Sequence, residues 1–292
     1  MRETTMLLGD GLVATLCVDG QARGTPGMEG LGLVLFNAGV VHRVGPHRIH
    51  VKLARALAAL GVPSIRLDLH GLGDSASATG ELDYGQQVVA DLRTAIDALA
   101  SGGGARRFSI LGFCSGVLPA VNCALADPRV VQIMLYDGIQ VRSSGAAWRS
   151  LLLRARAMRI DTLLRLLRRT GARLTARLHA SDRADVGIEP GAPTPRSLAP
   201  ALSGLVSRGV DVVIMHAGSD YSEVNHPDQA QRAFRSTGLS GLRFRFLEAV
   251  DHVVTSLAAQ RMFVDAVREI VAQAPRGTID EPGPVSARSV RP

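Results

Sequence analysis

The stretch SILGFCSGVLPA, residues 109–120, gives the clearest indication of the fold. An apolar run typical of a buried strand meets a glycine, a cysteine, a serine and a second glycine, and a helix-compatible stretch follows at once. A strand that turns sharply into a helix holds the central residue of the turn in strained, exposed geometry, which suits a nucleophile. The sequence therefore predicts a strand–turn–helix unit with a nucleophile at its apex.

Cys114 and Ser115 are the two candidates for that apex. Glycine is required two positions before and two positions after it, because side chains there would collide with the adjoining helix and strand. Gly112 and Gly116 bracket Cys114, whereas a phenylalanine and a valine bracket Ser115. Cys114 is therefore the predicted nucleophile, the alternative being a small buried hydrophobe, which is the commoner role of cysteine.

Short apolar runs alternate with amphipathic segments along the rest of the chain. We expect strands at 31–39, 62–69, 107–113, 130–138, 210–218 and 242–249, and helices at 47–61, 84–101, 115–126, 227–236 and 256–273. The first residues indicate an antiparallel hairpin at the sheet edge. This alternation predicts an α/β fold whose mostly parallel sheet is covered by helices on both faces.

The composition favours a cytoplasmic protein. The three cysteines have neither disulfide-framework nor zinc-site spacing, and the N-terminus does not resemble a signal peptide. No apolar run reaches the length of a membrane span. The net charge of +7 comes almost wholly from arginine, since Lys52 is the single lysine, and arginine bias by itself does not indicate nucleic acid.

One region interrupts the alternation. About seventy residues separate the strand that ends near Asp137 from the strand that begins near Val210, far more than an ordinary connection needs. We expect an α/β core at 1–138 and 197–274, an arginine-rich helical cap at 139–196 and a disordered tail at 275–292. The cap helices are either a solvated amphipathic pair or a lid that also binds an anionic partner.

The segment NAGVVHRVGPHRIHVKLARALAALGVPSIRLDLHGLGDS (37–75), together with GFCSG (112–116), resembles the α/β-hydrolase superfamily. Within it, the chain is similar to the exosortase A system-associated hydrolase 1 group, which shares an R-x-G-x-H-R stretch, an L-A-R-x-L-A helix, an R-x-D strand end and a cysteine elbow. The resemblance implies a bacterial cytoplasmic enzyme linked to gene clusters that also encode acyl-activating and carrier proteins.

A cysteine nucleophile needs a base and an orienting acid, which follow it in the chain in that fold in the order nucleophile, acid, histidine. His252 follows the last expected strand and precedes a helix, so it is the predicted base, the alternative being a surface loop residue. Asp220 follows the preceding strand and is the predicted acid, with Glu223 and Asp251 as substitutes.

Two further loops are expected near the elbow. The N–H of Ser115 and that of Ala38 or Gly39 are the predicted oxyanion-hole donors. In DLHGLGDS (68–75), Asp68 and the glycines are expected to hold the loop shape, and His70 is a candidate pocket residue.

These residues predict acyl transfer from an ester or thioester through a Cys114 acyl-enzyme, with simple ester hydrolysis as the close alternative and a non-catalytic binding scaffold as a distant one. No cofactor, metal or nucleic acid is expected. The cap offers a basic surface for an acidic acyl carrier protein, with these candidate contacts: Arg154, Arg165, Arg168, Arg169 and Arg173.

Overall fold

The computed structural model describes residues 1–22, 24–141, 192–218 and 224–276. Their strands form one eight-stranded sheet in the order β1-β2-β4-β3-β5-β6-β7-β8. The strands are β1 (Arg2–Leu8), β2 (Leu12–Val18), β3 (Leu31–Phe36), β4 (Ser64–Leu67), β5 (Arg107–Phe113), β6 (Val130–Tyr136), β7 (Asp211–Ala217) and β8 (Arg243–Leu247). The hairpin β1–β2 is antiparallel, β2 pairs antiparallel with β4, and all other pairs are parallel.

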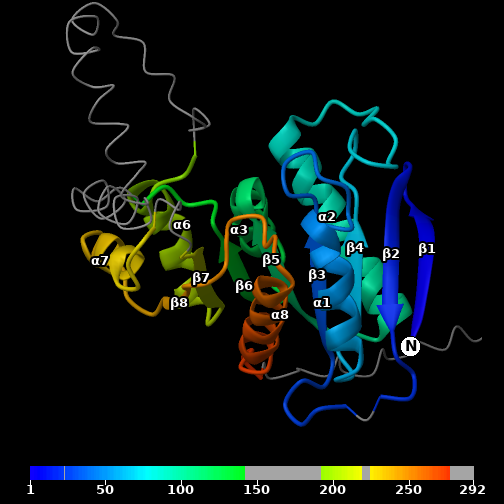
Figure 1. The fold of residues 1–292 in the computed structure, drawn as a ribbon. Coiled ribbons are helices and arrows are strands. Elements are labelled where there is room, and N and C mark those ends of the chain that lie inside the picture. The colour runs from blue at the N-terminus through cyan, green and yellow to red at the C-terminus, as the bar shows by residue number, and fades with distance from the viewer. Residues whose placement is uncertain (23, 142–191, 219–223, 277–292) are drawn as a thin grey trace, which may run out of the picture.

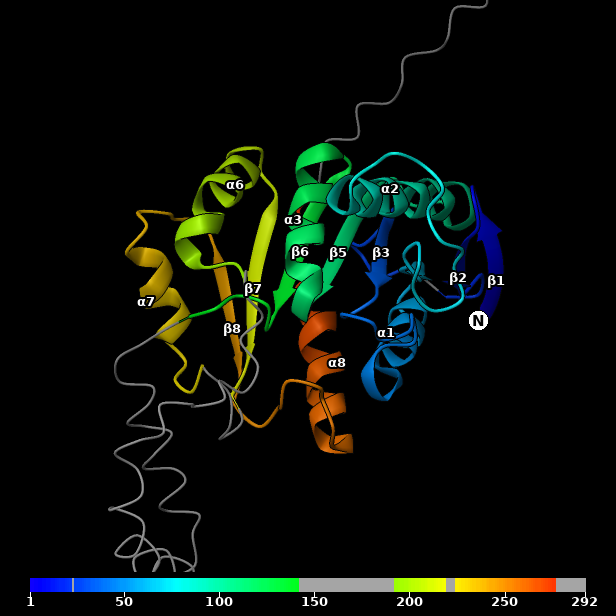
Figure 2. The ribbon, with the colours of Figure 1, turned by 90° about the horizontal axis from the view of Figure 1, so that it is seen from above.

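Helices cover both faces of the sheet (Figures 1 and 2). They are α1 (Ile49–Ala58), α2 (Tyr84–Gly103), α3 (Val117–Ala126), α6 (Pro195–Ser207), α7 (Gln229–Arg235) and α8 (Leu257–Val271), with short 3-10 turns η1 (Pro46–Arg48) and η2 (Cys114–Gly116). Figure 2 shows α1 and α8 on one face, and α2, α3 and α6 on the other. The predicted α/β fold with a mostly parallel sheet is confirmed.

The core is divided by the sheet into two apolar clusters. One cluster joins the buried side of α2, α3 and α6 to residues such as Val34 and Ile110, and the other joins α1 and α8 to residues such as Leu33 and Leu111. Both β3 and β5 are buried along their whole length, because alternate side chains enter opposite clusters. Central strands of this kind are rigid supports for the loops at their carboxyl ends.

Helix ends follow local sequence signals. Asp83 caps α2 through the Gln86 N–H, with the Gln86 side chain returning a bond to the cap backbone, and Ser256 caps α8 through the Ala259 N–H. The α8 cap fixes where the preceding loop, which carries His252, must end. Among the described residues no helix combines the length and the apolar character that crossing a membrane requires.

Most of the expected cap, residues 142–191, lies outside the described part of the chain, as does the tail beyond residue 276. From the remainder of the expected cap range, the structure describes the start of α6, which begins at Pro195 after a Thr194 cap. The proposed domain division therefore stays a prediction.

Candidate active site

The carboxyl ends of β3, β5, β6, β7 and β8 meet at one edge of the sheet because these strands run parallel. The candidate active site lies at this edge. Its central residue is Cys114, which follows β5 directly and has a left-handed φ of 55°. A non-glycine residue in this region is strained, and such strain is concentrated at functional sites.

Gly112 and Gly116 permit the turn, as the sequence predicts. A Cβ at Gly112 would lie 2.6 Å from the carbonyl oxygen of Gly116, and one at Gly116 would lie 3.1 Å from the Phe36 ring. Helix α3 therefore starts directly against β3 and β5. The thiol of Cys114 is free and partly exposed at the apex.

His252 lies in the loop between β8 and α8, and its Nδ1 is 3.2 Å from Oδ2 of Asp137. Hydrogen bonds to Asp137 and to Cys114 raise the pKa of His252 to about 10, against the opposing effect of burial. The ring is also stacked on Tyr136, with centroids 6.4 Å apart and an interplanar angle of 14°. The structure thus brings the predicted nucleophile and the predicted base into contact.

The carboxylate that contacts His252 is Asp137, which the sequence did not predict. It follows β6 with a left-handed φ of 51°, and its side chain is 9% exposed. Its Oδ1 accepts the Ala217 N–H at 2.9 Å and lies 3.2 Å from His216 Nδ1. Burial would raise the pKa of Asp137, but the bonds from His216 and His252 outweigh it and lower that pKa.

A signal for Asp137 existed in the sequence. The residue directly follows the buried run VVQIMLY, and Gly138 comes after it. Gly138 lies so close to the elbow that a Cβ there would collide with the carbonyl of Cys114. A carboxylate at a strand end beside a required glycine is as good a candidate as Asp220 on sequence grounds.

Asp220 and Glu223, the predicted acid and one of its substitutes, lie in residues 219–223, outside the described part. Asp251, the other substitute, is described, and its carboxylate accepts the Thr255 N–H at 2.7 Å. That bond closes the loop around His252 instead of orienting the imidazole. Tyr136 supports the same loop by donating its hydroxyl to the Asp251 carbonyl at 2.9 Å.

The two halves of the predicted oxyanion hole are adjacent. Gly39, with a φ of 58°, follows β3 after Asn37 and Ala38, and its N–H donates to the Ser115 hydroxyl at 2.7 Å. Ala38 is buried and bridges to Val41. The Gly39 amide is therefore aimed at the elbow, where in this structure the Ser115 hydroxyl accepts from it.

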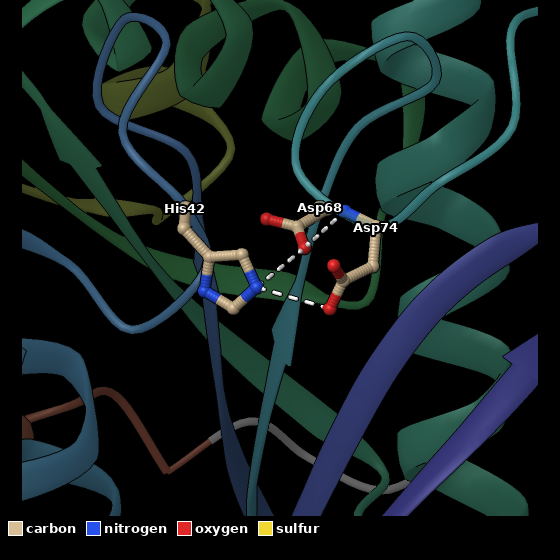
Figure 3. A group of neighbouring side chains, drawn as sticks. All are labelled: His42, Asp68 and Asp74. Atoms are coloured by element: carbon tan, nitrogen blue, oxygen red, sulfur yellow. Dashed lines mark hydrogen bonds and ion pairs between the residues drawn. The ribbon is translucent and has the colours of Figure 1, made fainter.

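A histidine and two aspartates converge near the same edge, as Figure 3 shows for His42, Asp68 and Asp74. Arg43 lies among them, and its Nη1 is 2.5 Å from Asp68 Oδ2 and 2.7 Å from Asp74 Oδ2. Its guanidinium supplies the positive charge that a metal ion would supply. We therefore interpret this cluster as an ion-pair network rather than a metal site.

Asp68 is the centre of that network, in agreement with its expected structural role. Its Oδ1 accepts from the Asn37 side chain at 2.9 Å and from the Arg43 N–H at 2.6 Å. Gly73 passes so close to the carboxylate that a Cβ would collide with it. The network fastens the loop after β4 to the loop that carries Gly39.

His70 lines a cavity, as predicted, but this cavity is not at the candidate active site. Its Nδ1 is 2.7 Å from the buried carboxylate of Asp91, and it borders a cavity of about 290 Å³ beside the β1–β2 turn. Neither Cys114 nor His252 lines this cavity. The candidate carrier contacts Arg154, Arg165, Arg168, Arg169 and Arg173 lie outside the described residues.

The fold and the geometry at its elbow define an α/β hydrolase. Residues 37–185, half of the chain, match the model of the Hydrolase_4 family, described as serine aminopeptidase, S33, and the chain belongs to this family. The family description names a serine enzyme, whereas the apex here is Cys114. No curated protein matches the chain.

Solved structures share the fold at low sequence identity. An α/β serine hydrolase without lid from Xanthomonas campestris is 14% identical, with a TM-score of 0.53, covering 94% of this chain and 98% of that one. A serine hydrolase homologue from Coxiella burnetii is 13% identical, with a TM-score of 0.52 and coverages of 93% and 95%. A proline iminopeptidase from Mycobacterium smegmatis is 17% identical, with a TM-score of 0.52 and coverages of 93% and 98%.

Proposed function

We propose that this hydrolase-family protein is a cysteine-dependent enzyme that acts on an acyl ester or thioester through a Cys114 acyl-enzyme. The observation that carries the proposal is a cysteine at the left-handed apex of the elbow, close enough to His252 to contribute to the raised pKa of its imidazole. Asp137, rather than Asp220, is the proposed orienting acid, because its carboxylate lies 3.2 Å from His252 Nδ1.

In the first half-reaction, the sulfur of Cys114 attacks the substrate carbonyl carbon, and the carbonyl oxygen becomes an oxyanion. The N–H groups of Ser115 and Gly39, with Ala38 as the alternative donor, stabilise that oxyanion once the Ser115 hydroxyl rotates away from Gly39. As the carbon–oxygen or carbon–sulfur bond breaks, His252 gives its proton to the leaving alkoxide or thiolate. The products are a thioester on Cys114 and a free alcohol or thiol.

In the second half-reaction, water or another acceptor attacks the Cys114 thioester while His252 accepts its proton. The sulfur leaves, which releases the acid, or the transferred acyl product, and restores the enzyme. A histidine whose pKa is about 10 is protonated at neutral pH. Such an imidazolium is ready to give its proton to the leaving group.

Exposed apolar residues favour an apolar acyl group. Val40 follows Gly39 directly and is 84% exposed, while Val253 follows His252 and is 43% exposed. Leu118, in the first turn of α3, is exposed as well. A free thiol nucleophile also suits the reducing cytoplasm, where we expect the protein to work.

Intact-protein mass spectrometry after incubation with a panel of acyl thioesters and esters tests the proposal. We expect a mass increase equal to the acyl group on wild type and none on Cys114→Ala. Added amine or alcohol acceptors distinguish transfer from hydrolysis by the mass of the released product. A panel that acylates neither protein, with no turnover, would favour the binding scaffold instead.

The resemblance to exosortase-associated hydrolases and the basic cap sequence support an acidic acyl carrier protein as the substrate donor. If so, Arg165→Glu combined with Arg169→Glu should slow the reaction of carrier-bound acyl groups by about tenfold at low salt and leave small thioesters unaffected. Added salt should reduce the difference, because it screens electrostatic steering. Equal loss on both substrates would mean that the cap only shapes the pocket.

A further inference from the structure

The Asp137 carboxylate is shared by two histidines. Its Oδ2 lies 3.2 Å from Nδ1 of His252, and its Oδ1 lies 3.2 Å from Nδ1 of His216. His216 belongs to β7, is 3% exposed, and is not among the groups that exchange protons or bonds in the proposed acyl transfer. Burying a polar side chain in the sheet core costs free energy of folding unless the side chain is hydrogen-bonded.

The strand pairing brings His216 to this position. The Asp137 N–H donates to the Met215 carbonyl at 3.1 Å, so the end of β6 continues its register against β7. Two donors from β7, the Ala217 N–H and the His216 ring, consequently reach the same carboxylate oxygen. Holding Oδ1 from two directions fixes the rotation of the carboxylate and leaves Oδ2 directed at His252.

The surroundings of His216 also select its tautomer. Its Nε2 is buried without a hydrogen-bond partner in the part of the chain that the structure describes. Among the described residues, a hydrogen on Nε2 would have no acceptor, which favours the tautomer that carries the hydrogen on Nδ1 and donates it to Asp137. The His216 ring is thus held in the tautomer that donates a hydrogen bond from Nδ1 to Asp137.

We propose that His216 is a positioning residue, which holds the Asp137 carboxylate in the orientation that His252 requires. The proposal rests on the proposed function, since it assigns His216 to the same acyl-transfer site. The titratable groups that face this pair are His252 and Cys114 on one side, and Tyr136 and Asp251 on the other. Among the contacts that lower the pKa of Asp137, the bond from His216 is the largest.

Two substitutions separate positioning from mere packing. His216→Asn keeps a side-chain N–H near the place of Nδ1, whereas His216→Leu fills similar space without a donor. The readouts are kcat and KM for an acyl thioester and, without any substrate, the pH titration of the Asp137 carboxyl carbon in protein labelled with ¹³C-aspartate. Asp137→Asn identifies that resonance by its disappearance.

We expect the Leu variant to titrate Asp137 at a pH at least about one unit higher than wild type, and to lose about tenfold or more in kcat with KM changed by less than about twofold. The Asn variant should stay close to wild type in both. If the Leu variant does not fold, His216→Phe takes its place as a second donor-free residue.

The proposal is overturned if the donor-free variant titrates Asp137 as wild type does, or if the Asn and Leu variants lose the same turnover. Failure of the proposed function gives a different result. In that case either Cys114→Ala keeps its turnover or the wild type turns over no acyl substrate, and the carboxyl titration still reports whether His216 holds Asp137.

Discussion

Two clusters of histidine and aspartate lie at the same edge of the sheet, and they differ in what neutralises the carboxylates. In the loop network, the Arg43 guanidinium lies against Asp68 and Asp74. At the elbow, the ion-pair partners of Asp137 within the described part of the chain are the imidazoles of His216 and His252. Arginine stays charged at every accessible pH and fixes a loop, whereas an imidazole can give up a proton. The cluster around Arg43 is therefore suited to holding a loop in place, and the imidazoles around Asp137 are suited to proton transfer.

The largest effect should come from the apex. Cys114→Ala should lower kcat/KM by about 10³-fold or more, because it removes the nucleophile, and it should leave the unfolding midpoint within a few degrees of wild type. Steady-state kinetics and thermal unfolding measure both. Ser115→Ala is the matched control, and we expect a change of less than about tenfold, since it keeps the backbone N–H.

A Ser115→Ala variant as inactive as Cys114→Ala would exchange the roles of the two residues. Wild-type activity in Cys114→Ala would show that the active site does not lie at this edge of the sheet.

The next largest effect should distinguish the two candidate acids. Asp137→Asn should lower kcat by about 10²- to 10⁴-fold, because the amide cannot hold the imidazole in the required tautomer and charge state. Asp220→Asn should lower kcat by less than about tenfold. Comparable kcat values for wild type and Asp137→Asn, with a collapse in Asp220→Asn, would restore Asp220 as the acid.

Substitutions in the loop network around Arg43 should lower the stability of the protein rather than its turnover. Arg43→Met leaves the fully buried Asp68 carboxylate without its guanidinium and should cost about 3 kcal/mol in the free energy of unfolding, measured with urea. Arg55→Met breaks the half-exposed pair with Glu3 and should lower the free energy of unfolding much less, because solvent screens an exposed pair. A large loss of kcat with unchanged stability in Arg43→Met would place this network in the chemistry.

The smallest effect is a pH dependence of stability, because the His252 side chain is 46% exposed and solvent screens its pairing with Asp137. The pKa of His252 in the folded protein, about 10, is above its ordinary value of 6.5, chiefly because of the hydrogen bond to Asp137. Its pairing therefore stabilises the fold fully below pH 6.5 and ceases to do so as the pH rises through about 10. The difference in unfolding free energy between wild type and His252→Gln should shrink across that interval. A difference that is constant with pH would mean that His252 is unpaired.

The α/β fold and the position of the elbow could be predicted from the sequence. Two glycines at the required spacing around Cys114, and strands that are nearly continuous in apolar residues, are local signals, because they reflect collisions and burial within a few residues. The histidine was also predictable, since His252 alone follows the last strand and precedes a helix.

The carboxylate that reaches this histidine could not be predicted from the sequence, because it depends on how the strands are arranged in the sheet. Asp137, Asp220 and Asp251 all follow expected strands, and sequence spacing does not report which strand ends lie side by side. The order β5-β6-β7-β8 puts the end of β6 between the elbow and His216. A left-handed backbone at Asp137 then turns its carboxylate toward both imidazoles. Hydrogen bonding depends on distances of about 3 Å across the sheet, and these are set by strand order and register rather than by separation along the chain.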